Sequence, residues 1–117
     1  MHSPADWGDD DPGGSLGDLA AALRGFARAR DWEQFHTPKN LAMALAGEAG
    51  ELVACFQWLT PEQSARVMDN PGAAADVESE LADVLQYLIR LADVLGVDLA
   101  DAVRKKMRLN ATRFPVG

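Results

Sequence analysis

A chain of 117 residues makes one domain, with room for a modest core but not for two. Its formal net charge of −7 argues against a nucleic-acid surface, because proteins that bind a duplex present a basic patch. No apolar run approaches the roughly 18 residues of a membrane span, and the lone Cys55 fits a reducing compartment, so we expect a soluble, cytoplasmic protein that contacts no membrane.

Residues 1–14 combine an acidic run with proline and glycine and have no hydrophobic periodicity. They predict a flexible acidic tail in front of one helical domain, residues 15–117. The first helix is expected to begin after Ser15 as N-cap, with Asp18 at the third helical position, and to end at about Arg30. An aromatic connection, residues 31–36, follows it.

Threonine followed by proline marks the next two helix starts. Thr37-Pro38 opens a helix expected to end at about Trp58, and Thr60-Pro61 opens a short helix to about Met68. Asn70-Pro71-Gly72 then predicts a turn.

The longest helix is expected from about Ala74 to Leu95, because Gly96 has the position of a glycine that ends a helix. Its apolar residues recur at the spacing of one helix face: Val77, Leu81, Val84, Leu88, Leu91 and Leu95. Asp98 predicts the N-cap of a last helix, to about Thr112. With no strand pattern in the sequence, we predict an all-α fold of long antiparallel helices, a four-helix-bundle-type core completed by homo-oligomerisation.

Two of these helices carry pairs of acids on a face that is otherwise apolar. Glu48 and Glu51 interrupt the second helix, and Glu80 and Asp83 interrupt the longest one. An isolated pair of this kind is usually a solvated helix face. Here both pairs lie within apolar faces, and antiparallel packing would bring them together, where buried carboxylates need cations to offset their desolvation. Oxygen ligands without a nearby histidine or cysteine favour Mg²⁺ or Mn²⁺ over zinc.

Basic and aromatic residues allow two interpretations each. Lys105, Lys106, Arg108 and Arg113 gather in the last helix, where they either complement the helix dipole or meet an anion, and Asn110 adds a donor. The aromatic side chains either pack in the core or stack on a nucleotide base; they are Trp32, Phe35, Trp58 and Tyr87.

Taken together, these motifs resemble the MazG-like nucleoside triphosphate pyrophosphohydrolases, and within that family the dCTP pyrophosphatase branch. The resemblance extends over about residues 16–115. It rests on the two acid pairs with the residues around them and on these segments: Arg30–His36, Asn40-Leu41, Phe56-Gln57-Trp58, Tyr87-Leu88, Val97-Asp98-Leu99 and Lys106-Met107 with Asn110, Arg113 and Pro115.

The resemblance implies a role for each matching residue. The four acids Glu48, Glu51, Glu80 and Asp83 would hold Mg²⁺ and form the catalytic centre. A second group would bind the substrate: Trp32, His36 and Trp58 around the base, with Tyr87, Lys106, Asn110 and Arg113 near the triphosphate or sugar. Family members form homodimers or homotetramers with sites at subunit interfaces. The chain departs from the animal pattern at Ala111 and Thr112, which stand where that pattern has arginines.

The sequence therefore predicts a Mg²⁺-dependent enzyme that hydrolyses a nucleoside triphosphate, dCTP or a modified dCTP, between the α and β phosphates. The products would be a monophosphate and pyrophosphate, in keeping with cleansing of the nucleotide pool. Two alternatives remain open at this point: a non-selective nucleoside triphosphate pyrophosphohydrolase, and a helical oligomer that binds nucleotides for regulation without cleaving them.

Overall fold

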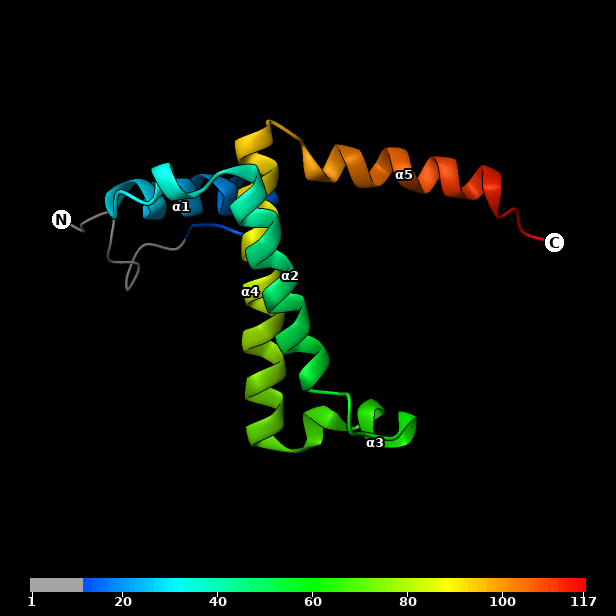
Figure 1. Cartoon of the computed structure of the whole chain (residues 1–117). Helices are drawn as coiled ribbons and strands as arrows, with labels where there is room; N and C mark the ends of the chain where they lie inside the picture. The colour runs from blue at the N-terminus through cyan, green and yellow to red at the C-terminus, as the bar shows by residue number, and fades with distance from the viewer. Residues whose placement is uncertain (1–11) are drawn as a thin grey trace.

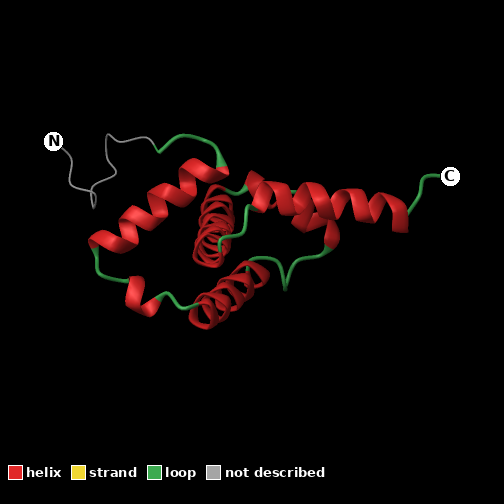
Figure 2. Ribbon diagram, turned by 90° about the horizontal axis from the view of Figure 1, so that it is seen from above, coloured by secondary structure: helices red, strands yellow, loops and turns green. Residues whose placement is uncertain are grey.

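The computed structural model describes residues 12–117, and over this range every regular element is a helix (Figure 2). The eleven residues before Pro12, which hold most of the predicted tail, lie outside the described part. The elements are α1 (Leu16–Ala29), η1 (Glu33–Phe35), α2 (Pro38–Ala54), α3 (Pro61–Ala65), η2 (Val67–Asp69), α4 (Pro71–Leu95) and α5 (Leu99–Arg113). Of these helices, none combines the length and the apolar character that crossing a membrane requires.

The helix starts predicted after Ser15, Thr37 and Thr60 are confirmed, because these side chains cap the helices as expected. Ser15 accepts a hydrogen bond from the Asp18 backbone N–H at 2.9 Å, and the Asp18 side chain returns the contact to Ser15 in a capping box. Thr37 and Thr60 each cap a helix whose first residue is proline. Gly96 ends α4 with a φ of 72°, a left-handed conformation that glycine adopts without steric cost.

The second helix ends at Ala54, four residues earlier than the predicted end at Trp58. The amides of Cys55 and Phe56 donate to carbonyls only three residues back, at 3.1 and 2.9 Å. Bonds of this type tighten the last turn of a helix and leave residues 55–58 as turns. The short helix predicted up to Met68 is likewise split into α3 and the 3₁₀ turn η2.

The expected turn at Asn70-Pro71-Gly72 is wrong, since these residues begin α4. Asn70 is the N-cap, and its side chain accepts a hydrogen bond from the Ala73 N–H at 3.0 Å. Pro71 then occupies the first helical position, where its missing N–H costs nothing. The same residue types favour turns and helix starts, and here the long apolar pattern that follows decides between them.

We expect Asn70→Ala to lower the free energy of unfolding by about 1 kcal/mol, because an N-cap side chain satisfies a backbone N–H that the helix leaves free. Chemical denaturation followed by circular dichroism measures this loss. Asn70→Asp keeps a capping oxygen and should retain most of the stability. If both variants were equally destabilised, the loss could not be assigned to capping.

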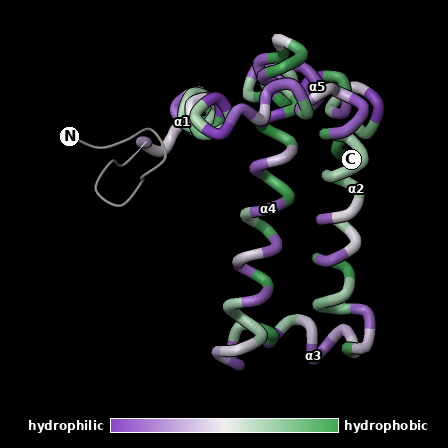
Figure 3. The backbone as a smooth tube through the Cα atoms, turned by 60° about the vertical axis from the view of Figure 1, so that its left-hand side comes forward, coloured by the Kyte–Doolittle hydropathy of each residue, from purple (hydrophilic) through white to green (hydrophobic). Residues whose placement is uncertain are grey.

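Two long helices, α2 and α4, lie side by side and run in opposite directions, as predicted (Figures 1 and 3). Helix α1 crosses α4 near its C-terminal end, and α3 lies at the opposite end of the pair (Figure 1). Helix α5 begins beside the crossing and projects away from the pair. The single chain therefore forms a two-helix stalk with side arms, and a four-helix bundle stays a prediction for an assembly.

The core of the single chain is small. Among the described residues, the buried apolar side chains are Ala27, Leu41, Val77, Ile89 and Ala92. The face predicted to be buried on α4 is only partly so, since Leu81 and Leu95 are 53% and 56% exposed. The radius of gyration of 17.1 Å also exceeds the roughly 13 Å of a compact domain of this size. The isolated chain thus leaves a large apolar surface in solvent.

Candidate functional site

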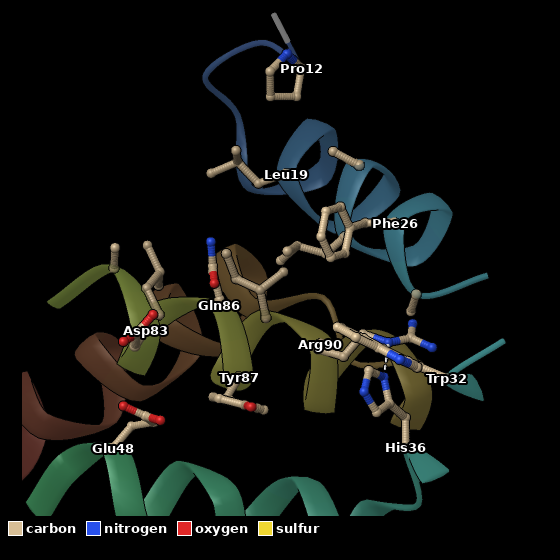
Figure 4. Close-up of a pocket in the computed structure, with 16 residues that line it drawn as sticks. Pro12, Leu19, Phe26, Trp32, His36, Glu48, Asp83, Gln86, Tyr87 and Arg90 are labelled. Carbon is tan, nitrogen blue, oxygen red and sulfur yellow. Dashed lines mark hydrogen bonds between the residues drawn. The ribbon is translucent and has the colours of Figure 1, made fainter. Parts of the chain in front are cut away.

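A cavity of about 630 Å³ lies where α1 and the connection after it meet α4 and α2 (Figure 4). Five residues predicted to form the site line it: Trp32, His36, Glu48, Asp83 and Tyr87. They come from three separate segments of the chain, and the crossing of α1 over α4 brings these segments together. Apolar side chains of α1 complete the wall, including Leu19 and Phe26. Pro12, the first described residue, also borders the cavity.

Three of the four predicted acids meet between α2 and α4. Glu48, Glu80 and Asp83 each offer a carboxylate oxygen, and these oxygens lie within 4.8 Å of one another. All three side chains are half-buried. Glu51 is exposed and does not belong to this group, although its charge acts on Glu80. One turn of α2, which carries Glu48, and one turn of α4, which carries Glu80 and Asp83, therefore place three carboxylates close together.

Of these three acids, Glu80 has the least favourable surroundings for a charged carboxylate. Its Oε2 atom is buried, and within the described part of the chain it has no hydrogen-bond partner. Burial and the charge of Glu48 raise the pKa of Glu80, and Asp83 and Glu51 add to the effect. A carboxylate oxygen without a partner, facing two other carboxylates, is a position that a cation would satisfy. The oxygen-only donor set could hold a hard divalent metal ion.

Aromatic rings form the wall at the other end of the cavity. Trp32 lies edge-on to Phe26 at 5.8 Å between ring centroids and is tilted against His36 at 6.1 Å. Trp32 remains 44% exposed, so part of its indole surface is open. Residues 33–35 form the 3₁₀ turn η1, and the Phe35 carbonyl accepts a hydrogen bond from Asn40 of α2 at 3.0 Å. This turn fixes Trp32 and His36 relative to α2.

Sequence reasoning missed Arg90, which lines the cavity from α4. Arg90 is 7% exposed and is the one charged residue that the described part of the chain buries. Its Nε–H donates to His36 Nδ1 at 3.1 Å, and its terminal nitrogen pairs with Asp93 at 3.0 Å. Arg24 of α1 pairs with the same carboxylate at 2.6 Å. The sequence does hold one indication of this role, because Arg90 interrupts an apolar run and is followed three residues later by Asp93.

In this network the pKa values of both Asp93 and His36 are lowered. Two arginines lower the pKa of Asp93, with the hydrogen bond from Arg24 as the largest cause. Burial, followed by the charge of Arg90, lowers the pKa of His36. Asp93 is therefore an anion and His36 a neutral imidazole at neutral pH.

The other predicted substrate residues lie elsewhere. Trp58 follows the end of α2 and is 87% exposed. Lys106, Asn110 and Arg113 lie on α5, which projects away from the α2–α4 pair (Figure 1). The structure does not bring these four residues to the cavity of their own chain, and their roles stay predictions.

Comparisons with known proteins identify the family of the chain. The family model described as MazG-like matches residues 44–117. The dCTP pyrophosphatase 1 proteins of Homo sapiens and Bos taurus are each 45% identical to the chain, over 89% and 87% of its length. The alignments cover 61% and 60% of those proteins, so the chain spans about three fifths of the length of the curated relatives it matches.

A solved structure shares the fold as well. The crystal structure of a pyrophosphatase from Archaeoglobus fulgidus superimposes with a TM-score of 0.80 and 37% sequence identity. The match covers 86% of this chain and 93% of that one. Since the family model alone spans more than half of the sequence, and its match includes all four predicted acids, the chain belongs to the MazG-like family.

Proposed function

We propose that this chain hydrolyses a nucleoside triphosphate between the α and β phosphates and releases a nucleoside monophosphate and pyrophosphate. The observation that carries the proposal is the carboxylate group Glu48, Glu80 and Asp83, placed at one end of a cavity whose other end is aromatic. A cation site beside an apolar, partly open ring surface suits a ligand that is a polyphosphate at one end and a base at the other. The names of the relatives support the same reaction.

The proposed substrate is dCTP or a modified dCTP, and the proposed cation is Mg²⁺, with Mn²⁺ as a substitute. Mg²⁺ binds phosphate oxygens together with a few carboxylates, so a site of three carboxylates and a triphosphate fits its preferences. The dCTP preference rests on the dCTP pyrophosphatase 1 relatives and on no contact in this chain. Removal of such triphosphates would cleanse the nucleotide pool.

The acids and two of the aromatic residues each have a role in this proposal. The carboxylates of Glu48, Glu80 and Asp83 hold the cation, which when bound neutralises negative charge on the pyrophosphate leaving group. Glu48 or Glu51 orients the attacking water. Trp32 stacks on the base, an interaction worth about 1–3 kcal/mol per base, while Tyr87 lies beside the acids and contacts the sugar or the phosphates.

Pyrophosphate release from a panel of nucleoside triphosphates, with and without Mg²⁺, tests the proposal directly. Release from dCTP and its methylated analogues alone supports the dCTP assignment. Release from every base would support a non-selective pyrophosphohydrolase. Binding of nucleotide without any release would overturn the proposed reaction and favour a regulatory binding protein.

We also propose that the chain works as a homodimer or homotetramer. The exposed apolar side chains support this, because Met43 of α2, Leu81 of α4 and Met107 of α5 are each more than half exposed in the single chain. Assembly would cover these side chains. It would also give Trp58, Lys106, Asn110 and Arg113, which lie away from the cavity of their own chain, a site to reach on a neighbouring copy.

We expect light scattering after size-exclusion chromatography to give two or four times the mass of one chain. The small core of the single chain is the physical reason, since a domain that buries so few side chains gains its stability by burying more in an interface. A monodisperse monomer at micromolar concentration would contradict the proposed assembly.

A further inference from the structure

Arg90 holds two partners at once, and both hydrogen bonds are partly buried. Its Nε–H points at His36 Nδ1, 3.1 Å away (Figure 4). Its terminal nitrogen lies 3.0 Å from an Asp93 oxygen. Asp93 is fixed in turn from α1, where Arg24 binds both of its oxygens at 2.9 and 2.6 Å. The guanidinium of Arg90 therefore has little freedom to turn away from the imidazole.

This contact determines where the imidazole carries its proton. Arginine is a donor only and stays charged at every physiological pH, so His36 Nδ1 must accept with its lone pair. A neutral imidazole whose Nδ1 accepts has its single proton on Nε2. Burial and the neighbouring guanidinium both lower the pKa of His36, which keeps the ring neutral.

The other ring nitrogen, Nε2, has no hydrogen-bond partner within residues 12–117. Among the described residues, the His36 ring has Arg90 as its one hydrogen-bond partner, and it lines the cavity beside Trp32, which is 44% exposed. A donor at the edge of a stacking surface is positioned to meet the edge of a stacked base. Cytosine presents acceptors there, at N3 and O2.

We propose that Arg90 is a positioning residue that fixes His36 as the neutral Nε2–H tautomer, so that the cavity offers a hydrogen-bond donor to an acceptor on the substrate's base. The inference rests on the proposed function for the identity of the ligand, but the tautomer itself is a property of the free protein. An analogue that places an amino group at this point would leave two donors facing each other and would be rejected.

Nitrogen-15 NMR of the full chain, labelled at histidine and free of nucleotide, tests the tautomer near neutral pH. We expect His36 to show a protonated Nε2 and an unprotonated Nδ1, assigned by the loss of its signals in His36→Gln. Arg90→Met should produce a mixture of the two tautomers. Arg28→Met is the matched control, because Arg28 also donates from Nε to a side chain, Glu33 at 3.1 Å, but on the exposed surface.

A wild-type spectrum with protonated Nδ1 would overturn the proposal, and so would an Arg90→Met spectrum identical to the wild type. These outcomes do not depend on activity, so they separate a failure of this inference from a failure of the proposed reaction. If Arg90→Met does not fold, the wild-type spectrum and the His36 variants still decide the question.

Kinetics with dCTP then test the donor. We expect Arg90→Met and His36→Leu to raise KM about tenfold, the effect of one hydrogen bond to the ligand, while kcat changes little. His36→Gln should restore KM to near the wild-type value, because the glutamine amide can place an N–H close to the position of Nε2. A structural role alone would lower kcat as well, and the glutamine variant would not restore the wild-type values. Equal KM values for the Gln and Leu variants would overturn the donor role.

Discussion

Glu80→Gln is expected to make the metal-free protein more stable and to abolish its stabilisation by Mg²⁺. Glu80 faces Glu48 and Asp83 within 4.8 Å, and its Oε2 is buried without a partner among the described residues. A neutral amide removes the repulsion and can donate a hydrogen bond to a neighbouring carboxylate. The same change removes a ligand oxygen of the proposed cation site, so turnover should fall by at least about a hundredfold.

The pH dependence of this effect follows from the raised pKa of Glu80. In the window between its ordinary value of 4.5 and the higher folded value, the folded protein binds more protons than the unfolded chain. Stability of the metal-free wild type therefore falls as pH rises through this window, and the advantage of Glu80→Gln is present at neutral pH and absent below about 4.5. Thermal denaturation in EDTA across this pH range measures the stability of the metal-free protein, and the same series in Mg²⁺ measures the stabilisation by the cation.

Glu78→Gln is the matched control. Glu78 lies two residues earlier on α4, is exposed, and is not part of the carboxylate group. Its neutralisation should leave the response to Mg²⁺ and the turnover unchanged. A Glu80→Gln protein that is less stable than the wild type in EDTA, or that still gains stability from Mg²⁺, would show that these carboxylates do not form a cation site.

Three of the four acids could be placed from the sequence, because their relation follows from helix geometry and from the antiparallel packing of two predicted helices. Glu80 and Asp83 are three residues apart and share a face, and Glu48 meets them because α2 and α4 pack antiparallel. Glu51 marks the limit of this reasoning. Glu48 and Glu51 have the same three-residue spacing, yet Glu51 is exposed while Glu48 is half-buried, so spacing alone does not decide which acid of a pair the partner helix covers.

The network around Arg90 could not be found in this way. Arg24 and Asp93 are 69 residues apart, and they meet only because α1 crosses α4. Periodicity treats Arg90 as a polar interruption among Leu88, Ile89 and Leu91. The burial of Arg90 depends on which helix covers that turn of α4, which is a property of the tertiary arrangement.

For two leucines of α4, periodicity predicts burial that the single chain does not show. Leu81 and Leu95 have the spacing of a buried face, yet no element of residues 12–117 covers them fully. The pattern of a sequence records every surface that is buried in the working protein, including surfaces between subunits. A single chain reveals only those that it covers itself.

Asp93→Asn is expected to lower the free energy of unfolding by about 3 kcal/mol, the typical cost of removing one partner from a buried ion pair. Asp93 is 14% exposed and joins α4 to α1 through Arg24, while it also neutralises Arg90. Asparagine leaves the Arg90 guanidinium, with 9% of its side chain exposed, without a counter-charge. Urea denaturation at neutral pH measures the loss, which is a large fraction of the roughly 5–15 kcal/mol that stabilises a domain.

Acid titration separates this electrostatic contribution from a packing defect. Two arginines hold the pKa of folded Asp93 below its ordinary value of 3.8, so its contribution is complete above that pH and is lost as pH falls through the folded value. The difference between wild type and Asp93→Asn should therefore shrink below pH 3.8.

Asp101→Asn is the matched control. It removes an ion pair of the same 3.0 Å length, Lys105–Asp101, whose side chains are 68% and 45% exposed. It should cost at most about 1 kcal/mol. Equal losses from the two variants would mean that burial adds nothing to the Asp93 pair and that α1 is held on α4 by apolar contacts alone.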